Sequence, residues 1–295
     1  MIFVTGGTGF IGKRLVNQLI TSGKPVRTLL RPSKKSPQLP FGVSVEAAVC
    51  SLRDATGLQA AMRDVDILFH LAGTERLSSR ARLNDIDVQG TEILMNAAVR
   101  AGVEKVFFLS HLGADRFSAY PLLRAKGMAE QYIIQSRIPH TIFRSAPVYG
   151  PGDQFTSSIA QLIRISPGIF LLPGNGAAVL QPLWVDDLIS CLMIALDNHQ
   201  IDQQIYSIGG VDFLSFRRIV EIVMETIGIK RRMVSLSPPQ IRMAGLFIEL
   251  FGRFPISTLW LDTLATDRTT QLDTLPRVFG ILPARFHTQL EYLKS

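Results

Sequence analysis

The chain has 295 residues, of which 47% are hydrophobic and 19% charged, with a formal net charge of +7 and a sequence pI of about 9.7. This composition predicts a globular protein of one or two domains, and the basic excess favours anionic partners such as a phosphorylated cofactor or an acidic lipid surface. No basic run is interleaved with aromatic residues, which argues against a nucleic-acid partner, and no apolar run approaches the roughly 20 residues of a membrane-spanning helix.

Strand-like and helical segments alternate over the first half of the chain. Runs rich in β-branched and aromatic residues predict strands at residues 2–5, 26–30, 43–49, 66–72, 105–110 and 140–144. The segments between them predict helices at residues 9–22, 55–62, 83–101 and 118–130. Apolar strands separated by helices indicate a parallel sheet covered on both faces. The expected fold class is therefore α/β, with a Rossmann-type doubly wound parallel sheet.

The pattern loosens after the stretch VYGPGD, residues 148–153, where glycine, proline and short elements dominate. We expect residues 1–150 to form the first domain, and residues 151–295 to form a smaller C-terminal α/β lobe on the carboxyl ends of the strands. Cys50 and Cys191 lie in apolar segments without a metal-ligand neighbour, which predicts buried thiols, a reducing compartment and no metal site. Because a strand opens the chain and leaves no room for a signal peptide, a cytoplasmic location is expected.

The stretch VTGGTGFIG places Gly6, Gly9 and Gly12 between the first strand and the first helix. In such a loop the first glycine permits a tight turn, the second lets the backbone approach a pyrophosphate, and the third lets the helix pack closely on the strand. The amino terminus of the helix then faces the phosphate charge. Because the strand, the helix and the βαβ repeat are all in place, the loop predicts a dinucleotide site.

The end of the second strand bears on which dinucleotide is bound. NAD-binding sheets usually end this strand with an acid that holds the ribose 2′-hydroxyl. Here the strand ends RTLLRPSKK, with Arg31 at its tip and Lys34 and Lys35 in the following loop. A cation at the tip suits a 2′-phosphate; the alternative is a solvated basic loop. We expect NADP(H) to be preferred, with NAD(H) as the alternative.

Several stretches together resemble the short-chain dehydrogenase/reductase superfamily, in its extended and atypical branches. TGGTGFIG matches the superfamily's cofactor loop, and HLAG matches the motif that runs beside the adenine ribose. DVQGT, VYGPGD and WVDDL resemble its later signatures, and SHLGAD followed by LLRAKGMAE is most similar to the group of the nucleotide-binding accessory subunit of respiratory complex I. The resemblance implies that the cofactor contacts Gly6, Thr8, Gly9, Phe10, Ile11, Gly12, Leu71, Ala72 and Gly73.

The chain departs from that superfamily at the reaction centre. Its enzymes carry a serine or threonine after the fifth strand and a tyrosine four residues before a lysine, and the tyrosine passes a proton to or from the substrate oxygen. The corresponding positions here are Leu112 and Leu122, while Lys126 is retained. Lys126 is expected to hold the nicotinamide ribose and is a candidate catalytic residue.

Two nearby side chains are candidates to replace the missing proton donor. Tyr120 stands six residues before Lys126, which places it well round a helix from the lysine, and Pro121 suits the start of a helix. Tyr120 is therefore not expected to be the catalytic acid. His111 adjoins the site and is a second candidate catalytic residue, although a histidine at a strand end is more often structural.

Residues 238–254, PPQIRMAGLFIELFGRF, form a nearly all-apolar helical segment with a narrow polar stripe. Such a helix is either buried in the lobe or docked on a membrane surface or partner, and the second alternative predicts a peripheral position on the cytoplasmic membrane face.

Two functions remain open from the sequence. The first is an NADP(H)-binding accessory, assembly or sensing subunit. The second is an NADP-dependent oxidoreductase that acts on an apolar substrate such as a quinone or isoprenoid. A sugar epimerase is a distant third.

Overall fold

The computed structural model describes all residues except 33–44, 75–82, 238–239, 241–263, 265 and 295. The chain divides into two compact units that interleave in sequence. Unit 1 contains Met1–Thr74, Ser79–Arg144 and Leu188–Tyr206, and unit 2 contains Ser145–Asp187 and Ser207–Ser295. The functional division expected at residue 150 stays a prediction.

A seven-stranded sheet forms the centre of unit 1, with the strand order β11-β6-β5-β4-β1-β2-β3. The strands from β3 to β5 in this order pair in parallel, and the register places Thr5 beside His70 and His70 beside Phe108. The strand bounds are β1 Ile2–Thr5, β2 Val26–Leu30, β3 Glu46–Val49, β4 Ile67–His70, β5 Lys105–His111, β6 His140–Ser145 and β11 Gln204–Ile208. The α/β fold with a Rossmann-type parallel sheet is thereby confirmed.

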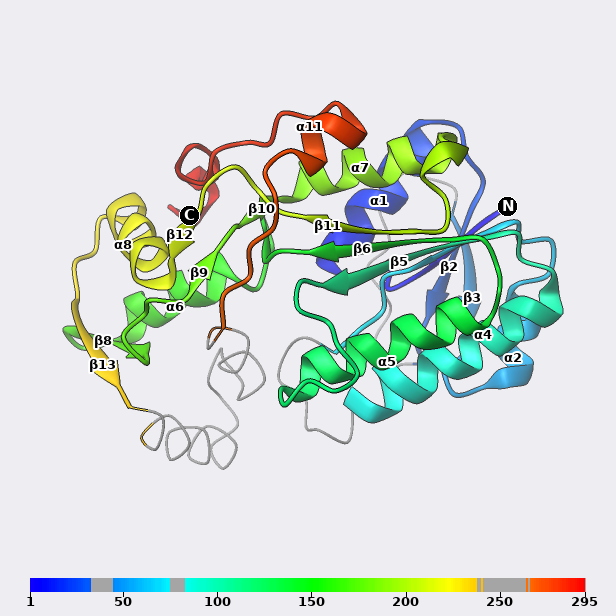
Figure 1. Ribbon diagram of the computed structural model, residues 1–295, viewed down its shortest axis with the longest axis horizontal. Coiled ribbons are helices and arrows are strands. Elements are labelled where there is room, and N and C mark those ends of the chain that lie inside the picture. The colour runs from blue at the N-terminus through cyan, green and yellow to red at the C-terminus, as the bar shows by residue number, and fades with distance from the viewer. Residues whose placement is uncertain (33–44, 75–82, 238–239, 241–263, 265, 295) are drawn as a thin grey trace. The chain divides into compact units, whose positions relative to one another are not determined.

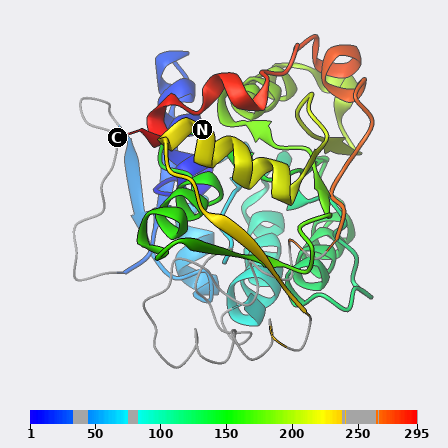
Figure 2. The same cartoon turned by 90° about the vertical axis from the view of Figure 1, so that its left-hand side faces the viewer.

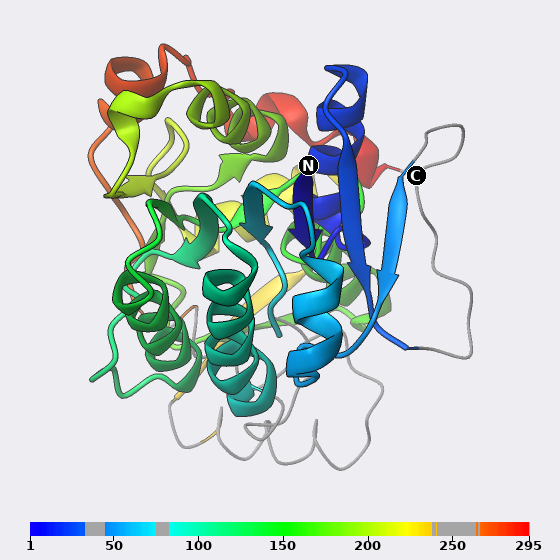
Figure 3. The ribbon, with the colours of Figure 1, turned by 90° about the vertical axis from the view of Figure 1, so that its right-hand side faces the viewer.

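Helices cover both faces of this sheet. Figures 1 and 3 show α2, α4 and α5 side by side on one face, whereas α1 and α7 lie on the other. The bounds are α1 Phe10–Thr21, α2 Ala55–Ala61, α4 Gly90–Ala101, α5 Pro121–Gln135 and α7 Val185–Asp197, with short turns at η1 Asn84–Gln89 and η2 His199–Ile201. Buried apolar side chains fill the layers, and the stacked rings of Phe69 and Phe107 lie 4.5 Å apart on β4 and β5. Cys50 and Cys191 are buried free thiols, as predicted.

Unit 2 has its own core, built around two amphipathic helices and three two-stranded sheets. The strands are β7 Val148–Tyr149, β8 Ile169–Pro173, β9 Val179–Leu180, β10 Leu183–Trp184, β12 Leu214–Ser215 and β13 Arg232–Leu236. The helices are α6 Thr156–Ile165, α8 Phe216–Ile227, α11 Thr274–Phe279, η3 Phe286–Gln289 and η4 Glu291–Leu293. Within the described residues, no helix is long and apolar enough to cross a membrane. Residues 238–254, apart from Gln240, lie outside the part of the chain that the structure describes.

Two details differ from the sequence prediction. The sheet gains a seventh strand, β11, which comes from the half of the chain where the pattern had loosened. The helix expected at residues 83–101 begins as the π-helical turn η1 and becomes α-helical only from Gly90. Single π-helical turns widen the backbone and often occur at functional sites.

The helix α5 packs tightly against the loop that precedes it. A methyl group on Gly127 would lie 2.3 Å from the backbone nitrogen of Arg116, closer than atoms can approach. Two fixed backbones therefore meet at this position, and neither is a flexible side chain that can move aside.

Replacing Gly127 with alanine should lower the free energy of unfolding by roughly 1–3 kcal/mol, because the added methyl overpacks this contact. In an unobstructed helix the same change would stabilise by about 1 kcal/mol. Urea denaturation measures the difference. The control is Gln131→Ala, which removes only a surface hydrogen bond from Arg116 and should cost about 0.5 kcal/mol or less. An equal or greater stability of Gly127→Ala would contradict the packing argument.

Candidate functional site

The glycine loop joins β1 to α1 at the carboxyl edge of the sheet. Gly6 has a φ of 76°, in the left-handed region that favours glycine, and accepts a hydrogen bond from the backbone N–H of Gly9 at 2.9 Å. A methyl on Gly6 would lie 2.7 Å from the backbone nitrogen of Ala72, and one on Gly12 would lie 2.1 Å from the Gly6 oxygen. Both glycines thus allow close backbone contacts: Gly6 with the segment that follows β4, and Gly12, which lies on α1, with the glycine loop.

Gly9 differs from these two glycines because its surroundings are open. A methyl there would meet only the Gly6 oxygen, at 3.2 Å. Gly9 is the N-cap of α1, no side chain caps this helix end, and its first turn contains no acidic residue. Unpaired backbone N–H groups and the positive end of the helix dipole therefore face outward, which is the arrangement that binds phosphate. Thr8, Phe10 and Ile11 lie in this same turn and are exposed or half-buried.

The segment after β4 runs beside the glycine loop. Leu71 donates its backbone N–H to the Thr5 oxygen at 3.1 Å, and Ala72 donates to the Thr5 hydroxyl at 3.3 Å. Gly73 is exposed and lies close to the Lys126 side chain of α5. A methyl group on Gly73 would be 2.9 Å from the Lys126 Nζ. The structure thus brings the glycine loop, Leu71–Gly73 and Lys126 together along one edge of unit 1.

Lys126 is buried, with 2% of its surface exposed, and its Nζ lies 3.2 Å from a carboxylate oxygen of Asp87, which is equally buried. The other Asp87 oxygen accepts hydrogen bonds from the Thr74 backbone N–H, at 3.0 Å, and from the Thr74 hydroxyl. The Lys126 Nζ also lies 5.3 Å from the centre of the Phe108 ring, on its face. An ion pair and a cation–π contact therefore hold the lysine in place.

A chain of hydrogen bonds continues from Asp87 into the sheet. The Thr91 hydroxyl donates to the Asp87 backbone oxygen at 2.7 Å and bonds the His70 Nε2 at 2.9 Å. The His70 Nδ1 bonds the Thr5 hydroxyl at 2.7 Å. Burial, and then the charge of Lys126, lower the pKa of His70 to about 3, so this imidazole is neutral at ordinary pH. His70 therefore links the glycine-loop strand to the ion pair without carrying charge.

The two leucines at the expected reaction centre are both buried, with 5% of Leu112 and 2% of Leu122 exposed. Leu122 lies in the first turn of α5, four residues before Lys126. Neither side chain carries a proton that it can transfer. The nearby Ser110 does not substitute, because its buried hydroxyl donates to Glu130 at 2.5 Å, within a network in which Arg144 also binds Glu130. The hydrogen bond that Arg144 donates to Glu130 is the main reason that the pKa of Arg144 is raised.

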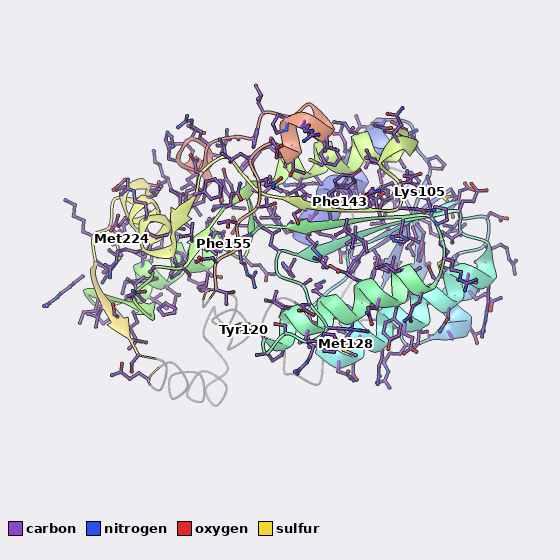
Figure 4. The ribbon with its side chains drawn as sticks, in the orientation of Figure 1. Lys105, Tyr120, Met128, Phe143, Phe155 and Met224 are labelled. Carbon is purple, nitrogen blue, oxygen red and sulfur yellow. The ribbon has the colours of Figure 1, made fainter. Side chains whose placement is uncertain are left out.

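Tyr120 is the N-cap of α5, with extended backbone angles, and Pro121 occupies the first helical turn. Figure 4 shows Tyr120 at the amino-terminal end of this helix. Tyr120 thus precedes the helix rather than lying one turn before Lys126 on its surface. His111 ends β5 and is half-buried.

Arg31 directly follows β2 and is exposed. Its position at the carboxyl end of the second strand matches the sequence prediction, whereas Lys34 and Lys35 lie outside the described residues. No group of three or more histidine, cysteine or acidic side chains is arranged to hold a metal ion in the described part of the chain.

Sequence reasoning missed the role of Asp87 and Thr74. The sequence identifies Asp87 only as the first residue of the DVQGT motif. The predicted helix contains three acids, Asp85, Asp87 and Glu92, and the sequence alone does not show that Asp87 is the one buried beside a cation. The π-helical turn that contains Asp87 was not visible from the sequence.

The neutral state of His70 predicts a pH dependence of stability. The folded state holds its pKa far below the ordinary value of 6.5, so the unfolded state binds more protons between about pH 6.5 and pH 3. The stabilisation is complete above pH 6.5 and is lost as the pH falls, by up to about 1.36 kcal/mol per pH unit. His70→Gln keeps a hydrogen-bond donor and acceptor but does not titrate.

Urea denaturation of both proteins at pH 7 and pH 5 compares these slopes. The wild type should lose more stability than His70→Gln over this interval. Equal losses would mean that His70 is not held neutral in the folded protein.

Several known proteins are similar to this chain in sequence or in fold. The chain is 26% identical to subunit 9 of the NADH dehydrogenase [ubiquinone] 1 alpha subcomplex of Arabidopsis thaliana, over 97% of this chain and 77% of the relative. It is 24% identical to ceramide reductase of Caulobacter vibrioides, over 98% and 93%. The crystal structure of UDP-glucose 4-epimerase from Thermotoga maritima superposes with a TM-score of 0.74 at 20% identity, covering 99% of this chain and 97% of that one, which shows a shared fold.

A family model described as NAD(P)H-binding matches residues 6–153. The match begins at the first glycine of the loop and ends at Asp153, so it includes the whole edge where the loop, Leu71–Gly73 and Lys126 meet. The cofactor is accordingly a nicotinamide dinucleotide, and the chain belongs to the NAD(P)H-binding family, with a fold similar to that of epimerases and dehydratases.

Proposed function

We propose that this chain binds NADP(H) and acts as an accessory, assembly or sensing subunit, at a membrane complex or an anionic membrane surface. The observation that carries this proposal is the pair of buried leucines, Leu112 and Leu122, where related enzymes carry hydrogen-bonding groups. The glycine loop and Lys126 keep the features that bind a dinucleotide. The relation to a complex I subunit supports a role inside a larger assembly.

Charge at the end of β2 supports the preference for NADP(H). Arg31 is exposed there, and β2 ends in two leucines instead of an acid. A guanidinium group binds phosphate through charge-assisted, often bidentate hydrogen bonds. An acid that would hold the 2′-hydroxyl of NAD is missing from this strand end.

The alternative is an NADP-dependent oxidoreductase acting on an apolar substrate such as a quinone or isoprenoid. It is supported by the relation to ceramide reductase, whose name indicates an apolar substrate, and by Lys126. Leucines beside the nicotinamide would suit a substrate of that kind. Either Lys126 or His111 would then have to move the proton.

Arg31→Asp should remove the preference for NADP(H). A charge-assisted contact with the 2′-phosphate is worth roughly 1.5–3 kcal/mol, or about 10- to 100-fold in affinity. Calorimetry with NADP⁺ and NAD⁺ measures it on both proteins. Arg63→Asp changes the charge equally, on an exposed residue between α2 and β4 at the opposite edge of the sheet, and should leave the preference intact. Equal affinities of the wild type for both cofactors would refute the assignment.

Tyr120→Phe should leave any NADPH oxidation nearly unchanged, because Tyr120 precedes α5 and does not share a helix face with Lys126. Loss of a true proton donor costs roughly 100- to 10,000-fold in rate. Single-turnover oxidation of NADPH with quinone or ceramide-like ketone substrates is the measurement. A loss of that size, with unchanged unfolding, would restore the enzyme with Tyr120 as its acid.

The matched variant for this experiment removes the lysine without leaving a buried charge. Lys126→Met alone would strand the Asp87 carboxylate and cost about 3–5 kcal/mol of stability. The double variant Lys126→Met/Asp87→Asn removes both charges together. It should fold and bind NADPH more weakly than Tyr120→Phe does.

A further inference from the structure

The two-stranded sheet formed by β8 and β13 in unit 2 has an exposed aliphatic face. Ile169 and Leu171 on β8 are 47% and 53% exposed, and Val234, which pairs with Leu171 across the sheet, is 37% exposed. Ile165, the last residue of α6, is 57% exposed. Figure 2 shows β13 in orange-yellow beside α8 in yellow. We call Ile165, Ile169, Leu171 and Val234 the aliphatic patch.

The orientation of this patch is fixed by the core of unit 2. Phe170 and Leu172, which alternate with the exposed residues along β8, are 3% and 0% exposed and belong to the unit 2 core. Side chains on a strand point alternately to opposite faces. The patch therefore cannot turn inward without pulling Phe170 and Leu172 out of the core.

Basic residues surround the patch. Arg232 pairs with Ile169 across the sheet, Lys230 and Arg231 directly precede β13, and Arg164 directly precedes Ile165. Arg231 donates from its Nε to the Ile163 backbone oxygen at 3.1 Å, and Arg164 donates to the Leu293 backbone oxygen at 2.5 Å, which hold both arginines at this site.

The chain segments that contain the patch carry no acidic side chain. Neither residues 154–178 nor residues 226–237, which contain the patch and its neighbours, include an aspartate or glutamate. The exposed side chains of Lys230 and Arg232 also form no ion pair with any residue in the described part of the chain. The side chains of Lys230 and Arg232 are thus available to an external anion.

We propose that the aliphatic patch and its basic rim dock on an anionic lipid surface. Aliphatic side chains enter the boundary between headgroups and acyl chains, while lysine and arginine remain at the level of the lipid phosphates. A second copy of this chain fits the surface poorly, because it would bring two clusters of cations together. This inference rests on the membrane part of the proposed function and names the surface responsible.

Co-sedimentation with vesicles tests the proposal. The full chain should pellet with vesicles of phosphatidylcholine and phosphatidylserine at low salt, be released at high salt, and bind pure phosphatidylcholine weakly. Lys230→Gln/Arg232→Gln should weaken the binding roughly 30-fold, since each cation near an anionic surface contributes about fivefold. Leu171→Ser should weaken it roughly fivefold or more through lost apolar contact.

Matched controls lie elsewhere on unit 2. Leu282 is 85% exposed, and the side chain of Arg277 is 81% exposed. Leu282→Ser and Arg277→Gln/Arg285→Gln should therefore bind vesicles like the wild type. Thermal unfolding confirms that each variant is folded. Because the two patch variants change different side chains, a folded variant of either kind is sufficient to test the proposal.

Three results would overturn the proposal: a wild type that stays in the supernatant with both vesicles, patch variants that bind like the wild type, or control variants that lose binding equally. If the wild type stays in the supernatant with both vesicles, an acidic protein becomes the expected partner of this face. Calorimetry on the same preparations measures the affinity for NADP⁺. A protein that binds NADP⁺ but not the vesicles would contradict the docking proposal and leave the proposed nucleotide binding intact.

Discussion

Asp87 and Lys126 bury opposite charges at the carboxyl edge of the sheet, and their neighbours are arranged so that both charges are tolerated. An unpaired buried charge costs several kcal/mol, so each member depends on the other. Thr74 bonds the carboxylate, Gly73 leaves out a side chain that would collide with the ammonium group, and His70 stays neutral beside it. The ion pair thus ties β1, β4, the turn η1 and α5 into one site.

This arrangement separates holding a cofactor from transferring a proton. Lys126 keeps its position through Asp87 and Phe108, so it needs no tyrosine hydroxyl to hold it. The leucine pair can therefore replace polar groups without disturbing the lysine or the glycine loop. Under the proposed function, an enzyme could evolve into a binding subunit by losing only the side chains that transfer the proton.

Local sequence patterns predicted the elements that form the dinucleotide edge, because glycine placement and strand alternation act over a few residues. Strand β11 was not predicted, since its pairing at the sheet edge beside β6 is decided by tertiary contacts. The Asp87–Lys126 contact joins residues on separate helices, and it depends on a π-helical turn that periodicity does not reveal. Arg31 and Lys126 could be proposed as site residues because each stands at a motif position, whereas Thr74 stands at none.

The exposed face of β8 illustrates a second limit of sequence patterns. Ile169, Phe170, Leu171 and Leu172 are all apolar, so the sequence contains no alternation to distinguish the buried side from the exposed one. Only the packing of Phe170 and Leu172 assigns the sides, and it leaves two aliphatic residues facing outward beside Arg232. An ordinary half-exposed strand would place polar residues on that side. On the proposed docking to anionic lipid, these aliphatic side chains would enter the boundary between headgroups and acyl chains, and Lys230 and Arg232 would face the lipid phosphates.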